Sequence, residues 1–242
     1  MKALILCAGY ATRLYPITEN QAKPLLKVAN KTILDHIIEK IQTLPEIDEI
    51  LIVTNNRFFQ DFVTHLKKGK YYKPITVIND HTLNNEDRLG AVGDLQYVLN
   101  KKQIDDDLIV IAGDNLFGFD IKNFLQFFKE KKTTVNAFHD LKDLNLVKGK
   151  YGVGIMNSTQ VSDFEEKPMK PKSTFASTAC YIFTKDDLNK VNTFIKTGKA
   201  DNPGDLIKYL TKESEIHGYV FEEHWLDIGS FESLKEAEEV YK

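Results

Sequence analysis

Apolar runs of strand length alternate with runs of helical period through the first half of the chain. In the helical runs an apolar residue recurs every three or four positions, whereas the other runs are short and continuously apolar. This alternation builds a sheet with helices on both faces. We therefore expect an α/β protein with a Rossmann-like, three-layer α/β/α fold and a mixed, mostly parallel sheet. The expected strands are 3–7, 49–54, 74–79, 107–112 and 133–137, and the expected helices are 33–41, 58–68, 91–99 and 121–131.

The second half of the chain has a different rhythm. After an irregular stretch at 138–151, short apolar runs follow one another at 151–155, 161–164 and 177–183, and a further run lies at 216–221. Short strands in succession are typical of antiparallel pairing. We expect them to form a small antiparallel lobe on the substrate side and not an independent domain.

Capping residues mark two of the helices. Thr32, with Asp35 three residues later, predicts a capping box at the first helix, and Ser230 precedes the periodic run that ends the chain. A chain of 242 residues can bury a full core, and we expect one domain.

The loop after the first strand consists of small residues. Residues 8–12 are Ala-Gly-Tyr-Ala-Thr, and Arg13 follows. Small residues let backbone N–H groups approach a ligand, Gly9 adopts angles that larger residues resist, and Arg13 adds a planar cation suited to phosphate. The loop matches neither Gly-x-x-x-x-Gly-Lys-Ser/Thr nor Gly-x-Gly-x-x-Gly. These residues alone fit a tight connection as well as a polyphosphate site.

Asp114 follows the expected strand at 107–112. Open sheets bind ligands beyond the carboxyl ends of their strands, where Asp114 would meet a substrate. Its hard oxygens suit Mg²⁺, which takes one or two carboxylates together with phosphate oxygens. A cap or turn is the other interpretation of a lone aspartate in this place.

Composition excludes several classes of protein. The net charge of −3 gives no reason to expect nucleic-acid binding, and no apolar run approaches the ~20 residues of a membrane span. Because an expected strand begins within the first three residues, we expect no signal peptide. Cys7 and Cys180 lie in apolar runs and are expected to be buried free thiols. We expect a cytoplasmic protein.

Four motifs together resemble the sugar-phosphate nucleotidyltransferases, the nucleoside-diphosphate-sugar pyrophosphorylases, over nearly the whole chain. The family has glycine at the places of Ala11 and Ala179, so the chain departs from the pattern there. No hexapeptide repeat follows, so the resemblance implies the catalytic domain alone. The motifs are Gly9-x-x-Thr12-Arg13-Leu14 with Lys23-Pro24, Gly113-Asp114-Asn115-x-Phe117, Glu166-Lys167-Pro168 and Trp225-x-Asp227-x-Gly229.

The resemblance implies Mg²⁺-dependent transfer of a nucleoside monophosphate from a nucleoside triphosphate to a sugar 1-phosphate. It divides the single domain into a nucleotide-binding part (1–140), a sugar-phosphate-binding part (141–229) and a C-terminal helix (230–242). The implied catalytic residues are Arg13, Lys23 and Asp114, and the implied metal ligands are Asp114 and Asp227. The implied nucleotide-binding residues are Leu6, Ala8, Gly9, Tyr10, Ala11, Thr12, Arg13, Lys23, Asn79 and Gly90. The implied sugar-phosphate-binding residues are Gly152, Glu166, Lys167 and Ala179.

Several alternatives stay open. Asn79 is a base contact or a turn residue, and Arg88 is a phosphate contact or a solvated charge. The resemblance favours dTTP or UTP and glucose 1-phosphate, but the motifs fix neither base nor sugar, because one methyl group separates uracil from thymine. A cytidylyltransferase for a non-sugar phosphate such as phosphocholine, and a non-catalytic nucleotide- or sugar-phosphate-binding regulator, are the competing functions. The resemblance also allows a homo-oligomer.

Overall fold

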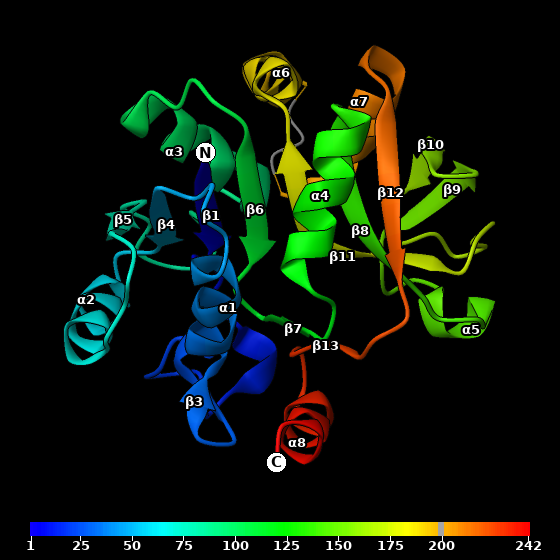
Figure 1. Cartoon of the computed structure of the whole chain (residues 1–242). Helices are drawn as coiled ribbons and strands as arrows, with labels where there is room; N and C mark the ends of the chain where they lie inside the picture. The colour runs from blue at the N-terminus through cyan, green and yellow to red at the C-terminus, as the bar shows by residue number, and fades with distance from the viewer. Residues whose placement is uncertain (198–200) are drawn as a thin grey trace.

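A nine-stranded sheet dominates the computed structural model, which describes residues 1–197 and 201–242. Its strand order is β5-β4-β1-β6-β11-β8-β12-β10-β9 (Figure 1). The strands of this sheet are β1 (Lys2–Leu6), β4 (Glu49–Thr54), β5 (Ile75–Asn79), β6 (Leu108–Ala112), β8 (Thr134–Asp140), β9 (Val153–Asn157), β10 (Gln160–Glu165), β11 (Phe175–Phe183) and β12 (Ile216–Phe221). Two small sheets pair β2 (Lys27–Val28) with β3 (Lys31–Thr32) and β7 (Asn115–Phe117) with β13 (Trp225–Asp227).

Helices connect most of these strands. They are α1 (Ile33–Gln42), α2 (Phe59–Lys68), α3 (Ala91–Lys102), α4 (Ile121–Lys131), α5 (Leu144–Val147), α6 (Lys185–Ile195), α7 (Pro203–Glu213) and α8 (Phe231–Val240). Two short 3₁₀ helices, η1 (Thr12–Leu14) and η2 (Lys23–Leu25), lie in the connection between β1 and β2. In the part of the chain that the structure describes, no helix has the length and apolar character to cross a membrane.

The prediction of a mixed α/β fold is confirmed, but the sheet is not mostly parallel. Four neighbouring pairs, β1–β4, β1–β6, β4–β5 and β8–β12, are parallel. Four others, β6–β11, β8–β11, β10–β12 and β9–β10, are antiparallel. The strands expected to form a small antiparallel lobe are antiparallel, but they are part of the main sheet, because β11 inserts between β6 and β8 and the β9–β10 hairpin extends the same sheet. The direction of β11 depends on the path of the chain, which the pattern of apolar residues does not reveal.

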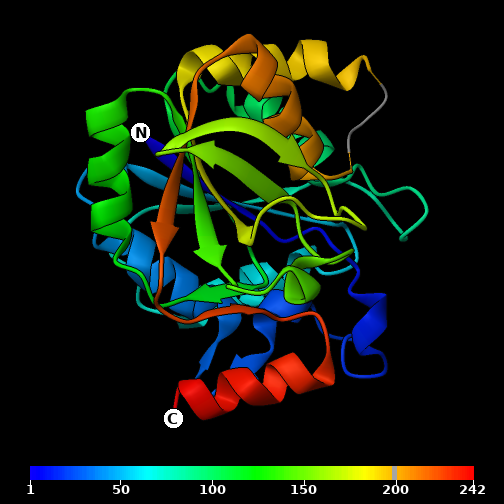
Figure 2. The same cartoon turned by 90° about the vertical axis from the view of Figure 1, so that its right-hand side faces the viewer.

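The sheet has an apolar core on each face. Successive residues of β1 point to opposite faces, so Ala3 and Ile5 belong to one core and Leu4 to the other. The first core is covered by α1, α2 and α4, and the second by α3, α6 and α7. In two views α8 lies apart from the main sheet, beside the β2–β3 hairpin (Figure 1, Figure 2).

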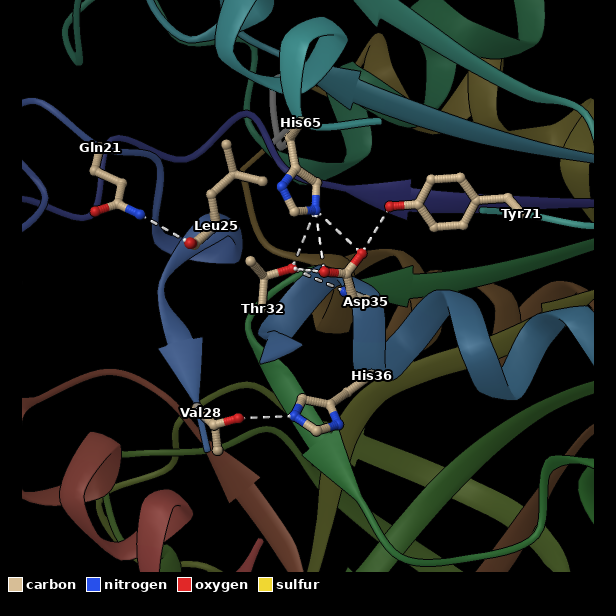
Figure 3. Close-up of polar contacts among 8 residues, drawn as sticks. All are labelled: Gln21, Leu25, Val28, Thr32, Asp35, His36, His65 and Tyr71. Carbon is tan, nitrogen blue, oxygen red and sulfur yellow. Dashed lines mark hydrogen bonds and ion pairs between the residues drawn. The ribbon is translucent and has the colours of Figure 1, made fainter. Parts of the chain in front are cut away.

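The start of α1 differs from the predicted capping box. Thr32 caps the helix, because its hydroxyl oxygen accepts from the Asp35 N–H at 3.1 Å. The Asp35 carboxylate does not close the box. It instead accepts from the hydroxyl groups of Thr32 and Tyr71, at 2.7 and 2.8 Å, and pairs with His65 at 3.1 Å (Figure 3). This cluster ties α1 to α2 and to the loop before β5.

The remaining predictions differ in how well they match. The bounds of β4, α4 and β12 are those predicted, and the capping box of α8 joins Ser230 to Ser233. The stretch expected to be irregular contains the end of β8 and the short helix α5. The sequence reasoning missed α6 and α7, and also the short strands β7 and β13.

Candidate active site

A cavity of about 250 Å³ opens at the carboxyl end of β6. Segments far apart in the chain form its walls, including the loop after β1, β11, the start of α7 and β13. Seven residues that the sequence singled out line it: Arg13, Asp114, Gly152, Glu166, Lys167, Ala179 and Asp227. The other lining residues are Ala91, Ala112, Asn115, Lys150, Tyr151, Phe164, Ser177, Tyr181, Asn202, Pro203, Gly204 and Trp225.

The small sheet of β7 and β13 brings Asp114 and Asp227 together. These strands are antiparallel with Asn115 opposite Asp227, and the Ile228 N–H donates to the Asp114 carbonyl oxygen at 3.0 Å. Among the described residues, no three His, Cys, Asp or Glu side chains gather to hold a metal ion. Two carboxylates nevertheless fit a hard divalent cation that takes its other oxygens from phosphate and water.

The two carboxyl groups have opposite pKa shifts. Burial and the nearby charge of Asp114 together raise the pKa of Asp227 to about 6. Burial also opposes ionisation of Asp114, but the Lys23 ammonium outweighs this effect and lowers the pKa of Asp114. The charge of Asp114 thus opposes ionisation of Asp227, and a cation bound between the two carboxyl groups would relieve this repulsion.

Two cationic side chains flank this pair. Lys23 donates to Asp114 Oδ2 at 2.5 Å, and the two side chains are only 13% and 29% exposed. Lys23 is the first residue of η2, and Pro24 follows it in the same turn. Arg13 acts on Asp227 through its charge, and within the described parts of the chain it forms no ion pair. Arg13 is thus available to an anionic ligand.

The loop after β1 is held by hydrogen bonds from outside it. The Asn55 amide donates to the Ala8 carbonyl oxygen at 3.0 Å, and the Thr18 hydroxyl donates to the Ala11 carbonyl oxygen at 2.8 Å. Gly9 faces open space, because a Cβ atom there would meet no atom within 4 Å. The loop therefore has a fixed backbone with an unobstructed surface, as a phosphate-binding segment requires.

Both alanines that replace the family's glycines adopt a left-handed backbone. The φ angle is 49° at Ala11 and 53° at Ala179. The pairing of β11 with β8 shifts register between Ser177 and Tyr181, so Ala179 lies in an irregularity of the strand. A left-handed backbone costs a residue with a Cβ atom about 1–2 kcal/mol, which explains the preference for glycine. The chain keeps a backbone suited to glycine at both positions despite the added methyl groups.

Glu166 lies between two glycines on the other side of the cavity. A Cβ atom on Gly152 would come within 2.9 Å of Glu166 Oε2, and one on Gly204 would overlap the same oxygen. Burial raises the pKa of Glu166, while the charge of Lys167, whose Nζ is 3.7 Å from Glu166 Oε1, opposes the shift. A tightly enclosed carboxyl group of this kind can accept hydrogen bonds from the hydroxyl groups of a ligand.

Of the nucleotide-binding residues predicted from the resemblance, only Arg13 lines the cavity. Lys23 reaches it through Asp114, and Gly90 precedes Ala91, which lines it. The others outside the lining are Leu6, Ala8, Gly9, Tyr10, Ala11, Thr12 and Asn79.

Asn79 and Arg88 are engaged with neighbouring residues. The Asn79 amide donates to Asn56 Oδ1 at 2.8 Å, and its oxygen accepts from the His81 N–H at 2.7 Å, as in a turn. Arg88 forms an exposed ion pair with Asp201 at 3.1 Å. A base contact by Asn79 remains a prediction.

Sequence reasoning missed the start of α7, which contributes Asn202, Pro203 and Gly204 to the cavity. A signal was present, because proline is favoured in the first turn of a helix and Leu206 and Leu210 follow at helical spacing. It also missed the contact of Trp225 Nε1 with Asn115 Oδ1 at 2.7 Å, which joins β13 to β7 beside the two aspartates.

An α/β sheet whose strand ends carry paired carboxylates next to cationic side chains is typical of proteins that act on phosphorylated ligands. The chain is a member of the Nucleotidyl transferase family, whose model matches residues 2–242. It is an enzyme family that transfers nucleotidyl groups.

Curated relatives match almost the whole chain. The chain is 31% identical over 250 residues to the bifunctional protein GlmU of Methanocaldococcus jannaschii, covering 98% of the chain and 53% of that protein. It is 29% identical over 232 residues to a protein of Sulfolobus acidocaldarius assigned as a mannose-1-phosphate guanyltransferase, covering 95% of the chain and 60% of that protein. The chain therefore spans about half the length of the curated relatives it matches.

Solved structures share the fold. A Bacillus anthracis protein assigned as a glucose-1-phosphate thymidylyltransferase superposes with a TM-score of 0.87 at 25% identity, covering 99% of this chain and 94% of that one. An apo UDP-glucose pyrophosphorylase superposes with a TM-score of 0.81 at 20% identity, covering 100% and 98%. The second likeness is one of fold alone.

Proposed function

We propose that this protein transfers a nucleoside monophosphate from a nucleoside triphosphate to a sugar 1-phosphate, with Mg²⁺ as cofactor and pyrophosphate as the second product. The observation that carries the proposal is the meeting of Asp114 and Asp227 with Arg13, Lys167 and Glu166 in one cavity. Carboxylates for a cation, cations for phosphates and an enclosed carboxyl group for hydroxyl groups are the three requirements of this reaction.

The chemistry needs positioning more than proton transfer. A phosphate monoester is already an anion at neutral pH, because its second pKa is about 6. It can attack the α-phosphorus directly, and pyrophosphate leaves in line. The barrier arises from repulsion between two anions, which fixed positive charge and alignment reduce. In this proposal Arg13 neutralises the departing pyrophosphate, and Lys23 stabilises the charge at the α-phosphate.

The cation would be held by Asp114 and Asp227. A bound Mg²⁺ would neutralise charge on the phosphates of the substrates. Lys23 now occupies Asp114 Oδ2 and leaves Oδ1 to the Asn115 amide at 2.8 Å. Asp114 thus divides its two oxygens between Lys23 and Asn115, and a cation held by Asp114 would share the Oδ2 atom with Lys23 or take it over.

The two parts of the domain have separate tasks in this proposal. Residues 1–140 bind the nucleotide, with the backbone of residues 8–12 around its phosphates. Residues 141–229 bind the acceptor: Lys167 holds the sugar phosphate, and Glu166 orients the sugar between Gly152 and the start of α7.

The favoured substrates are dTTP or UTP and glucose 1-phosphate, in keeping with the names of two fold neighbours. Because other relatives are named for mannose 1-phosphate or as GlmU, other bases and sugars also have to be tested as substrates. Phosphocholine also belongs in it, because Tyr151 and Trp225 meet in the cavity with ring centroids 4.8 Å apart and aromatic faces attract quaternary ammonium groups.

Asparagine variants of the aspartates test the proposal. Asp114→Asn and Asp227→Asn keep the shape of the side chain and remove its charge, so each should lower turnover at saturating Mg²⁺ by at least ~10²-fold. Asp186→Asn, on the exposed first turn of α6, is the matched control and should leave turnover unchanged. Wild-type turnover in either cavity variant would remove that aspartate from the cation site.

A further inference from the structure

Four buried polar side chains connect the loop after β1 to the helix α3. They are Tyr10 in the loop, Asp80 and Thr82 after β5, and Asp94 on the first turns of α3. Each is only 4–6% exposed. The cavity does not include them, and the proposed reaction assigns a role to Tyr10 alone, as a loop residue. Buried polar groups on this scale require partners, so their hydrogen bonds can be followed one by one.

The direction of the hydrogen bonds can be read from Asp80. The N–H and the hydroxyl of Thr82 both donate to Asp80 Oδ1, at 2.7 and 2.9 Å. Because the Thr82 hydroxyl gives its hydrogen to Asp80, Tyr10 must be the donor in its contact with Thr82 Oγ1 at 3.2 Å. The chain of donors thus runs from Tyr10 to Thr82 and ends on the Asp80 carboxylate.

Asp94 approaches Asp80 from the other side. Among the described residues, the buried oxygens Asp80 Oδ2 and Asp94 Oδ1 have no hydrogen-bond partner, and the pKa of each carboxyl group depends on the other group. Two carboxylates cannot share a hydrogen bond unless one of them is protonated. Asp80 already accepts two hydrogen bonds from Thr82, which favour its ionised form, so Asp94 is the group that holds the proton. Burial and the charge of Asp80 raise the pKa of Asp94 to about 8, in the same direction.

We propose that Asp94 is a proton-bearing positioning residue, which donates to Asp80 and thereby fixes Tyr10 and the backbone of residues 8–12 for nucleotide binding. The inference rests on the proposed function for the identity of the ligand, but the effect on the loop is independent of it. Neither aspartate touches the nucleotide in this account. They act through Thr82 and Tyr10, together with Asn55, which holds Ala8 from the opposite side.

A pH dependence follows from the shared proton. Above about pH 8 Asp94 ionises, and two adjacent buried carboxylates repel each other. The charge of Asp87 also acts on Asp80, and hydrogen bonds from backbone N–H groups lower the pKa of Asp87 itself. Arg57 acts through its charge on Tyr10.

The neighbouring weak acids do not interfere with this titration. Burial raises the pKa values of Tyr10 and of the Cys7 thiol, which feels the charge of Asp94. Asp94 is therefore the group of this set that titrates between pH 7.5 and about 9.

Two substitutions of Asp94 distinguish the loss of the hydrogen bond to Asp80 from the loss of side-chain bulk. Asp94→Asn keeps a hydrogen-bond donor toward Asp80 and cannot ionise, whereas Asp94→Leu keeps the bulk and removes the donor. Val98→Ala is the control. Val98 lies on the same helix as Asp94 and is fully buried in the apolar core that α3 covers, so its truncation destabilises α3 without changing Asp80 or Asp94.

The experiment measures nucleotide binding by calorimetry, with dTTP, UTP, CTP and GTP in turn, from pH 7.5 to 9.5. Wild type should lose affinity about tenfold over this range, because the network opens. Asp94→Asn should bind as wild type does at pH 7.5 and keep that affinity at pH 9.5. Asp94→Leu should bind at least about tenfold more weakly at every pH, whereas Val98→Ala should melt earlier with unchanged affinity.

Amide hydrogen exchange at residues 8–12 provides a second readout that needs no ligand. Asp94→Leu should accelerate exchange there, and Val98→Ala should not. If no nucleotide binds to wild type but this exchange pattern appears, the proposed function fails and the network stands. Equal exchange in Asp94→Leu and Val98→Ala would overturn the positioning role, and so would an Asp94→Asn variant as impaired as Asp94→Leu.

Discussion

Gly204 offers the sharpest test of the acceptor side of the cavity. It occupies the second position of α7, directly against the carboxyl group of Glu166. In Gly204→Ala the new methyl carbon would overlap Glu166 Oε2 and come within 2.6 Å of Phe164 Cε1. Because Phe164 is fully buried, its ring cannot move far, and the carboxyl group of Glu166 has to shift.

The size of the effect follows from these overlaps. Overpacking a closed site costs typically about 1–3 kcal/mol, which for a domain of this length lowers the melting temperature by about 2–12 °C. The Glu166 oxygen must move by roughly 1 Å, and a displacement of that size at a positioning group can cost about 10²-fold in rate. We expect the loss in kcat/KM for the sugar phosphate, with the KM for the nucleotide unchanged.

Gly218→Ala is the matched control for this variant. Its methyl carbon would overlap Met156 Sδ and lie 3.0 Å from Phe138, so it also overpacks the fold, but without contacting Glu166. Initial rates with each substrate varied in turn, together with melting curves, distinguish the two variants. A Gly204→Ala enzyme with wild-type sugar-phosphate kinetics, or one no worse than Gly218→Ala, would refute the role given to Glu166.

Two further predictions concern charge and backbone strain. Lys2 and Lys102 overcome the effect of burial and hold the pKa of Glu49 at about 2, below its ordinary value of 4.5. The stabilisation of the fold by ionised Glu49 is therefore fully present above pH 4.5 and is lost as the pH falls toward 2. The urea concentration at half-unfolding should consequently fall less steeply with decreasing pH in Glu49→Gln than in wild type. Equally steep falls in the two proteins would contradict this. Replacing Ala11 or Ala179 by glycine relieves a left-handed backbone and should leave the melting temperature unchanged or up to about 4 °C higher. A clear fall in either variant would mean that the alanine side chain is needed.

The sequence predicts the bounds of an element correctly where its apolar period is continuous and polar residues mark its ends. β4 and α4 have the expected bounds because the period of each is uninterrupted and polar residues end it. The helix α7 escaped notice although Pro203 and the spacing of Leu206 and Leu210 indicated it. The direction of β11 within the sheet was not predictable, because local pattern does not record which strands become neighbours.

The candidate site also has features that the sequence predicted and features that it did not. The meeting of Asp114 with Asp227 was expected from the motifs, and the pairing of β7 with β13 explains it physically. The ion pair of Lys23 with Asp114 and the enclosure of Glu166 by Gly204 were not foreseen. Such contacts join residues distant in sequence, and they emerge only when the sheet is assembled.

Release of pyrophosphate tests the central claim most directly. The protein is incubated with Mg²⁺ and each common nucleoside triphosphate, against glucose 1-phosphate, mannose 1-phosphate, glucosamine 1-phosphate and phosphocholine. We predict release that requires both substrates, is greatest with dTTP or UTP and a sugar 1-phosphate, and disappears in Asp114→Asn. Binding of nucleotide without pyrophosphate release from any pair would contradict the account and would indicate a regulatory binding protein.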